Sequence, residues 1–323
     1  MLGEELKAKA ALYGAIFLTF LGYGGRFAGL EPFNNQFFAY AAWAYILFAD
    51  NLTYRLSGSS PLISRTGEFA ALAAWSVAFS GVFELLNLRL DGWHYIFQPA
   101  TLSVRWTGRA LTWGAFLPSL FATADLLRCL GLFRNLKCPP LKVSAVLLNG
   151  VLAAGLLLAA LALAWPARFW PLIWLAPFFL ADPLNYKLGL PSLLREWQGG
   201  VPGKTLRLTT AGIVCGLLWS AWNGAAGARW AYAPFKKAGP EVFGLPLPAY
   251  LAFGLFALGA YSAYALASWL REGRTWEEGG WAPQGRRPPW WAPYALWPLL
   301  IITSYIVFRL TDAHLVKLYL GWI

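Results

Sequence analysis

Nine stretches of this chain are long and free of charged side chains, and they constrain its fold more than any other feature. A helix that crosses the hydrocarbon layer of a membrane needs about 20 mostly apolar residues. The core of the most apolar stretch, residues 147–163, contains almost only Leu, Ala, Val and Gly. The stretches are Ala10–Gly25, Pro32–Ala49, Phe69–Phe83, Ala110–Ala124, Val143–Ala167, Phe169–Ala181, Leu208–Ala228, Val242–Leu270 and Pro288–Phe308. They predict an all-α, polytopic integral membrane protein with about nine transmembrane helices.

The composition supports the same environment. Hydrophobic residues make up 58% of the chain and charged residues 13%, which is about half the usual charged share. So few charges cannot cover the surface of a soluble enzyme, so soluble, disordered and secreted disulfide-rich classes are excluded. The net charge of +11 comes from basic residues scattered between apolar stretches, without a basic patch that would bind nucleic acid. We expect membrane lipids, and other membrane subunits, as partners.

The residues that bind metals and redox groups are scarce. The chain has three cysteines, two histidines and one methionine, and its cysteines are not clustered as zinc or iron–sulfur sites require. We therefore expect free thiols at Cys129, Cys138 and Cys215, no metal site and no cofactor.

The distribution of basic residues predicts the orientation in the membrane. With the N-terminus in the cytoplasm, the larger share of the 26 Lys and Arg residues falls on the cytoplasmic side, as positively charged loops prefer. Nine spans then place the C-terminus on the other side. We expect a bacterial inner-membrane protein with a cytoplasmic N-terminus and a periplasmic C-terminus, and with its first apolar stretch retained as a helix.

A pattern of matched residues suggests an internal repeat. Residues Ala49–Leu56 and Ala181–Leu188 share Ala-Asp, Leu and Tyr positions at equal spacing. Later matches follow in the same order: Asn87, Trp93, Tyr95 and Pro99 in the first copy, and Asn223, Trp230, Tyr232 and Pro234 in the second. Because the copies lie four spans apart, they would have the same direction in the membrane. The alternative is chance similarity between aromatic-rich spans.

The repeat divides the chain into a first unit, 1–142, with helices 1–4, and a second unit, 143–272, with helices 5–8. Residues 273–323 then form a cytoplasmic linker, rich in Gly, Pro and Arg over 273–289, and the last helix.

A polar stripe in the first copy is the candidate site. Glu84, Asn87 and Asp91 are spaced i, i+3 and i+7, so they share one helical face, and His94 follows them. The second copy has Ser220, Asn223 and Gly227 instead. Because intramembrane acids are costly and usually functional, we predict Glu84, Asn87, Asp91 and His94 as catalytic residues. The alternative is a structural salt bridge of Glu84 with Arg89, Arg105 or Arg109.

Three further acids, Asp50, Asp125 and Asp182, lie at predicted helix ends, each with a basic residue three to five positions later. We expect helix-end salt bridges with Arg55, Arg128 and Lys187, respectively.

The segments 230–234 and 243–253, together with Phe83-Glu84, Asn87, Trp93 and Tyr95, resemble an uncharacterised family of bacterial multi-pass inner-membrane proteins over about residues 40–270. A fainter resemblance links the Trp-x-Tyr and Gly-x-Pro arrangement to small membrane lycopene cyclases. That resemblance implies acid–base chemistry on an isoprenoid by a Pro-x-Glu-Glu pair. Here Pro246 is followed by Leu247, Pro248 and Ala249, so those carboxylates are absent.

Three functions remain open. A membrane enzyme or binding protein would handle a hydrophobic, lipid- or isoprenoid-like substrate at a polar site near the outer face, with Glu84 as general acid or base and Asn87 and His94 orienting the substrate. A transporter would use the two repeats as moving units. A noncatalytic subunit or scaffold of a larger membrane complex would use the aromatic loops as contact surfaces. We favour the first.

Overall fold

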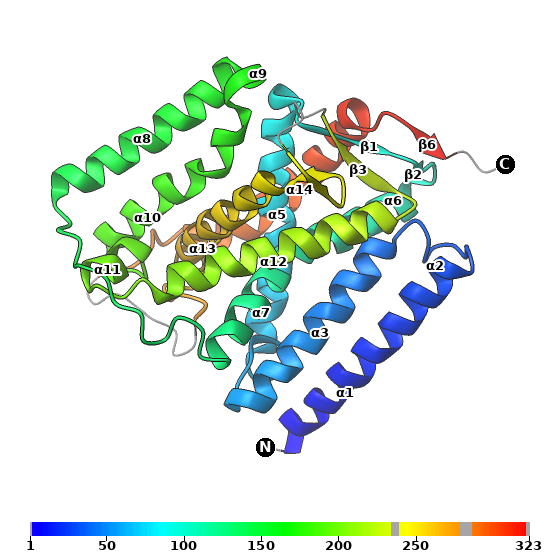
Figure 1. Ribbon diagram of the computed structural model, residues 1–323, viewed down its shortest axis with the longest axis horizontal. Helices are drawn as coiled ribbons and strands as arrows, with labels where there is room; N and C mark the ends of the chain where they lie inside the picture. The colour runs from blue at the N-terminus through cyan, green and yellow to red at the C-terminus, as the bar shows by residue number, and fades with distance from the viewer. Residues whose placement is uncertain (1, 234–238, 278–285, 321–323) are drawn as a thin grey trace. The chain divides into compact units, whose positions relative to one another are not determined.

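Each of the nine apolar stretches folds mainly into helix (Figure 1). The computed structural model describes residues 2–233, 239–277 and 286–320, so 278–285 of the predicted linker, and Pro234 of the predicted repeat, lie outside the described residues. Among the described helical segments, five are long and apolar enough to cross a membrane: Thr66–Leu90, Leu102–Cys129, Ala145–Ala164, Leu247–Glu272 and Ala292–Leu315. The prediction of a helical, membrane-embedded, multi-pass protein is confirmed at that level.

The chain forms two compact units, and each draws on separated stretches. The first contains 1–130, 214–250 and 304–323, and the second contains 131–213 and 251–303. Three of the four boundaries therefore fall inside helices, namely α12 (Gly203–Ala225), α13 (Tyr250–Glu272) and α14 (Ala292–Leu310). The predicted division at 142 and 272 separates sequence repeats, whereas these units are defined by compact packing. The predicted division therefore stays a prediction.

The first unit begins with long helices and short turns between them. Its elements before residue 130 are α1 (Leu2–Thr19), the π-helical η1 (Phe20–Gly24), α2 (Gly25–Phe27), α3 (Phe37–Ser57), α4 (Pro61–Ser64), α5 (Thr66–Leu90), β1 (Trp93–Ile96), β2 (Gln98–Pro99), α6 (Leu102–Gly114) and α7 (Phe116–Cys129). The later ones are the end of α12, β3 (Arg229–Tyr232), β4 (Glu241–Val242), β5 (Leu245–Pro246), η3 (Leu247–Ala249), the end of α14, η4 (Thr311–Leu315) and β6 (Tyr319–Leu320).

Small residues let α1 and α3 lie side by side (Figure 1). Ala8 and Ala42 are fully buried, and alanines at helix contacts allow backbones to approach closely. The Asn51 side chain of α3 donates to the carbonyl oxygen of Ala8 at 2.5 Å. A polar side chain thus joins the two helices beside their buried alanines.

A break between α6 and α7 is held by one hydroxyl. Ser76 of α5 donates to the carbonyl oxygen of Trp113 at 2.5 Å and accepts from the backbone nitrogen of Leu117 at 3.0 Å. Both backbone groups would lack a helical partner at the break, and Ser76 is fully buried. The break sets the direction of α6, which carries several side chains of the candidate site.

Two short sheets close the same end of the first unit. Strand β1 pairs antiparallel with β3, with Trp93 opposite Tyr232 and Tyr95 opposite Trp230. Strand β2 pairs in parallel with β6 near the C-terminus, and the backbone of Lys317 donates to the carbonyl oxygen of Tyr95 at 2.8 Å. The residues after α5 are therefore held between two distant parts of the chain.

The second unit is built from α8 (Ala145–Ala164), α9 (Pro166–Phe169), the 3-10 helix η2 (Trp170–Trp174), α10 (Ala176–Leu188), α11 (Leu193–Gln198) and parts of α12, α13 and α14. Helix α8 packs on α10, where a Cβ at Gly155 would lie 2.9 Å from that of Phe179. Helices α12 and α13 meet at glycine, since a Cβ at Gly212 would overlap the backbone of Phe253.

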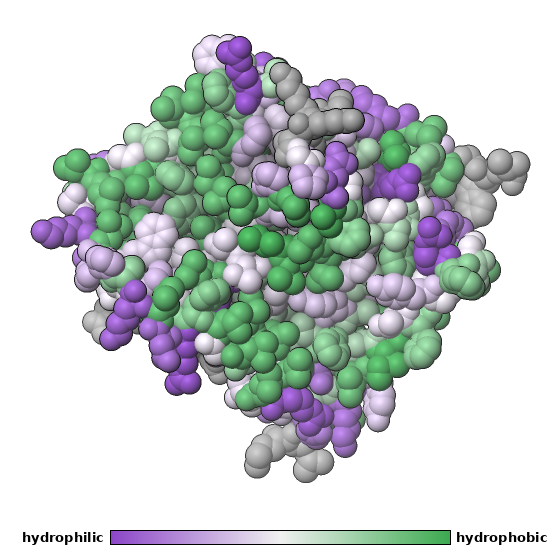
Figure 2. Space-filling model, viewed as in Figure 1, coloured by the Kyte–Doolittle hydropathy of each residue, from purple (hydrophilic) through white to green (hydrophobic). Residues whose placement is uncertain are grey.

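Hydrophobic side chains cover much of the surface seen in Figure 2. On α8, Val146 is 81% exposed and Leu156 60%; in η1, Phe20 is 75% exposed. Such surfaces would be unstable in water but match a hydrocarbon solvent.

Candidate functional site

Glu84 is buried near the end of α5, and its hydrogen-bond partners are aromatic. Tyr95 donates its hydroxyl to Glu84 Oε1 at 2.6 Å, and Trp93 Nε1 lies 3.1 and 3.3 Å from the two carboxyl oxygens. Burial, followed by the charge of Glu84, raises the pKa of Tyr95 well above its usual range near 10. Tyr95 therefore keeps its proton and acts as the donor toward Glu84.

The alternative interpretation, a structural salt bridge of Glu84 with Arg105 or Arg109, is not realised, because these arginines bind another acid. Arg105 Nη2 and Arg109 Nη2 each lie 2.8 Å from a carboxyl oxygen of Asp312 in η4. Trp106 Nε1 also donates to Asp312, at 2.8 Å. The sequence separation of more than 200 residues explains why no sequence pattern indicated this pairing.

Asn87 is fully buried and holds the turn that leads into β1. Its side-chain oxygen accepts from the backbone of Gly92 at 2.8 Å and Trp93 at 3.3 Å, and its nitrogen donates to the carbonyl oxygen of Trp93 at 2.7 Å. All of these contacts are with backbone. Asn87 therefore positions Trp93, and through the strand Tyr95, against Glu84.

The structure does not bring Asp91 and His94 to the Glu84 carboxyl group. Asp91 is exposed at the end of α5, with a φ of 48° that ends the helix. Side chains alternate across a strand, and Trp93 and Tyr95 both contact Glu84, so His94 points to the opposite side of β1.

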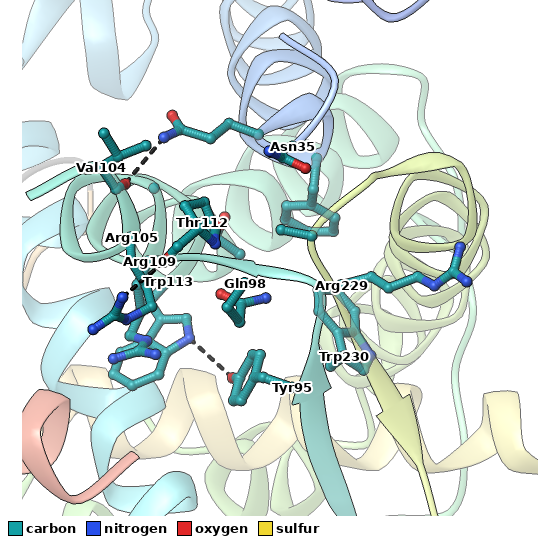
Figure 3. A pocket seen from close by; sticks show the side chains of 15 residues that line it. Asn35, Tyr95, Gln98, Val104, Arg105, Arg109, Thr112, Trp113, Arg229 and Trp230 are labelled. Carbon is teal, nitrogen blue, oxygen red and sulfur yellow. Dashed lines mark hydrogen bonds between the residues drawn. The ribbon is translucent and has the colours of Figure 1, made fainter. Parts of the chain in front are cut away.

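A cavity of about 50 Å³ lies next to Tyr95. Its walls come from the loop before α3, from β1 and β2, from α6 and from β3. In Figure 3, Gln98 reaches toward its centre above Tyr95, Arg105, Arg109 and Trp113 form one wall, and Asn35 lies at its upper side. Trp113 Nε1 donates to the Tyr95 hydroxyl at 3.3 Å. Tyr95 thus connects the cavity with Glu84, which does not itself line it.

One polar atom beside this cavity lacks a hydrogen bond. Asn35 Oδ1 is buried and has no donor among the residues that the structure describes. A buried oxygen without a partner costs about 1–3 kcal/mol, so a hydrogen-bond donor from outside the chain would stabilise the site. Sequence reasoning named Tyr95 only as a repeat match and Arg109 only as a possible ion-pair partner of Glu84, and it did not identify Asn35 or Gln98. These residues converge from separate segments, and the only local signal was the Trp-x-Tyr segment.

The three acids at predicted helix ends have different outcomes. Asp125 does pair with Arg128, at 3.3 Å, as expected. Asp50 instead accepts from Ser60 Oγ at 2.5 Å and the backbone of Leu62 at 3.1 Å. Arg55 pairs with Glu5.

Asp182 repeats the arrangement of Asp50 in the second unit. It accepts from Ser192 Oγ at 2.7 Å and from the backbone of Leu193 and Leu194, each at 2.9 Å. Lys187 donates to Asn149 rather than to Asp182. Both acids therefore cap the short helix that follows a turn, through a serine ten positions later.

Among the described residues, no group of three or more His, Cys, Asp and Glu side chains could hold a metal ion. No protein-family model, curated protein or solved structure matches this chain.

Proposed function

We propose that this protein binds a hydrophobic, lipid- or isoprenoid-like substrate in a bacterial inner membrane, and that the polar end of the substrate enters the cavity beside Tyr95. The observation that carries the proposal is a cavity that contains charged and hydrogen-bonding groups, in a protein whose surface exposes many large hydrophobic side chains. The cavity joins an unpartnered amide oxygen at Asn35, a buried cation at Arg109 and a tyrosine hydroxyl bonded to Glu84.

The proposed topology has nine spans, with the N-terminus in the cytoplasm and the C-terminus in the periplasm. The unequal distribution of Lys and Arg supports it. Alkaline phosphatase fused after Ile323 should be active, and fused after Lys137 inactive. The reverse pattern would invert the orientation.

The proposed internal duplication is supported by local geometry. Asp50 and Asp182 each bind a serine ten positions later, and Asn87 and Asn223 each bind the backbone at a following tryptophan. In the β1–β3 pair, Trp93 lies opposite Tyr232 and Tyr95 opposite Trp230. A two-fold axis between matched Trp-x-Tyr strands would give this reciprocal register.

In the proposed enzyme, Tyr95 and Glu84 form a unit that can exchange a proton with the bound group. The hydroxyl of Tyr95 borders the cavity, and its proton is directed at Glu84 over 2.6 Å. Proton transfer requires such contact between donor and acceptor. Asn87 positions this unit through the turn it holds. Asp91 and His94, predicted as catalytic from their spacing, would act outside the cavity, near its sheet.

A transporter is the second candidate, because parallel repeats are one of the architectures that transporters use. It would require a path through the membrane as well as a cavity, whereas the binding proposal requires the cavity alone. Lipid binding without transport across liposome membranes separates the two.

The direct test uses an isoprenoid alcohol that carries a photoactivatable diazirine in its tail. Irradiation with the purified protein should label peptides around the cavity. Thr112→Trp places a large side chain in the cavity wall and should reduce labelling at least about fivefold, which is about 1 kcal/mol.

Thr107→Trp, on an exposed position of the same helix, is the matched control and should leave labelling unchanged. Equal labelling of wild type and Thr112→Trp would contradict the proposal and favour a scaffold.

A further inference from the structure

The charges around the cavity are unbalanced. Three arginines line it, Arg105, Arg109 and Arg229, and no acidic residue is among the described residues that do. Asp312 binds both Arg105 and Arg109, and the charge of Glu84 also acts on Arg109. Two carboxylates cannot neutralise three guanidinium groups, so the cavity wall keeps a positive charge.

The two buried arginines differ in how many of their donors are used. A guanidinium group has five N–H donors. Arg105 donates to Asp312 from Nε at 3.1 Å and from Nη2 at 2.8 Å. Its Nη1 donates to the carbonyl oxygens of Pro99 and Ala100. Arg105 therefore holds Asp312 and the loop in place, with little capacity for another ligand.

Arg109 has capacity left. Among the described residues, it donates to Asp312 from Nη2, at 2.8 Å, and to the carbonyl oxygen of Phe308 from Nη1, at 3.2 Å. Its guanidinium carbon lies 5.7 Å from the ring centres of Tyr95 and Trp113, which accounts for part of its charge stabilisation. The side chain is 3% exposed, so its remaining donors have little contact with bulk water.

Asp312 has no capacity left. Oδ1 accepts from Arg105 Nε and Arg109 Nη2, and Oδ2 accepts from Arg105 Nη2 and Trp106 Nε1. A carboxylate has about four lone-pair positions, and all are used here. The free donors of Arg109 therefore require another acceptor, and a charged oxygen would gain most because hydrogen bonds between ions are about twice as strong as neutral ones.

We infer that the polar end of the substrate is an oxyanion, a phosphate or carboxylate head, bound by the free donors of Arg109 in the cavity beside Tyr95 and Gln98. This inference rests on the proposed function and specifies its substrate class. The cavity of about 50 Å³ fits a head of this size, since one water occupies about 10–15 Å³ on the same measure. The apolar tail would remain in the surrounding lipid.

The test compares ligands that share one tail. Oleyl phosphate, oleate and oleyl alcohol are titrated into the full chain in maltoside detergent without phosphate buffer, and binding is measured by native mass spectrometry. The two anions should bind at least tenfold more tightly than the alcohol. Inorganic phosphate alone should bind much more weakly than oleyl phosphate.

Arg109→Gln should remove the preference for the anions while leaving binding of oleyl alcohol. Lys317→Gln is the matched control: it removes one positive charge from an exposed side chain whose backbone contacts Tyr95, and it should keep the preference. If Arg109→Gln does not fold, Arg109→Lys retains the charge but loses the planar donor geometry, and should weaken anion binding severalfold.

The outcomes separate the two proposals. Equal binding of oleyl alcohol and oleate by the wild type would contradict the inference that the head group is an oxyanion. The proposal of a lipid-binding site would stand. Equal binding of inorganic phosphate and oleyl phosphate would support an oxyanion-binding site. It would contradict the proposal that the substrate is a lipid. An equal loss of preference in Arg109→Gln and Lys317→Gln would also overturn the inference, because it would reflect overall charge.

Discussion

The end of α5 with β1 and the end of α12 with β3 share a turn but differ in chemistry. In both, an asparagine holds the backbone of the following tryptophan, Asn87 with Trp93 and Asn223 with Trp230. In the first region Glu84 then accepts from the strand's tryptophan and tyrosine, whereas the second has Ser220 one turn before its asparagine. The comparison teaches that the asparagine turn has a structural role in both regions, and that the carboxyl group of Glu84 is a feature of the first region alone.

The largest expected effect tests the two aspartates that cap the short helices. Asp182 accepts four hydrogen bonds, including one from Ser262 at 3.1 Å, and Asp50 accepts two. Removing a buried acceptor leaves its donors unpaired at about 1–3 kcal/mol each. Asp182→Ala should lower the free energy of unfolding by about 4 kcal/mol and Asp50→Ala by about 2 kcal/mol.

Both values can be measured by SDS titration in mixed micelles. Asp182→Asn and Asp50→Asn, which keep the size of the side chain, should recover part of each loss. Equal losses in the two alanine variants would contradict the prediction, because they would show that the number of hydrogen bonds to each aspartate does not set its contribution to the free energy of unfolding.

A smaller effect distinguishes the two asparagine turns. Asn87 is fully buried with three backbone hydrogen bonds, while Asn223 is 8% exposed with two. Asn87→Ala should cost about 3 kcal/mol and Asn223→Ala about 1–2 kcal/mol. Asn87→Ala should also reduce labelling by the photoactivatable alcohol more than Asn223→Ala, because Asn87 holds the turn into the strand of Tyr95, whereas Asn223 holds only Trp230 on the opposite strand. An equal reduction in both variants would instead assign the cavity to the whole strand pair.

The smallest effect compares Tyr95 with Tyr232 in alkali. Burial raises the pKa of Tyr232 to about 12, and burial together with Glu84 raises the pKa of Tyr95 well above its usual range. A tyrosine with a raised folded-state pKa contributes stability that is fully present below its unfolded pKa near 10 and is lost as the pH rises through the folded value.

Stability should therefore fall above about pH 10. Tyr95→Phe and Tyr232→Phe should flatten that loss equally up to about pH 11, and Tyr95→Phe should flatten it more near pH 12, where Tyr232 begins to ionise in the folded protein. Unfolding titrations from about pH 9 to about pH 12 measure the two slopes. A steeper loss in Tyr95→Phe than in the wild type would contradict the proton assignment between Tyr95 and Glu84.

Glu84 shows how far sequence reasoning reached into the site. The short apolar run before it placed a carboxyl group at the end of a helix, and the structure does bury it there. Its spacing to Asn87 was equally visible, but spacing cannot distinguish an amide that binds substrate from one that binds backbone. The partner of Arg109 lies about 200 residues away, so only tertiary packing could reveal it.

The sequence by itself determined the environment and the helical class, because apolar stretches between charges have few stable conformations outside a membrane-spanning helix. It also indicated the matched turns, since the same short pattern folds locally in the same way. Only the tertiary structure decided that Tyr95, Gln98 and Arg109 border one cavity, and that Asp312 binds both arginines on its wall. The physical reason is that hydrogen bonds and charges act over a few ångströms in space, whereas the residues that make them are separated along the chain.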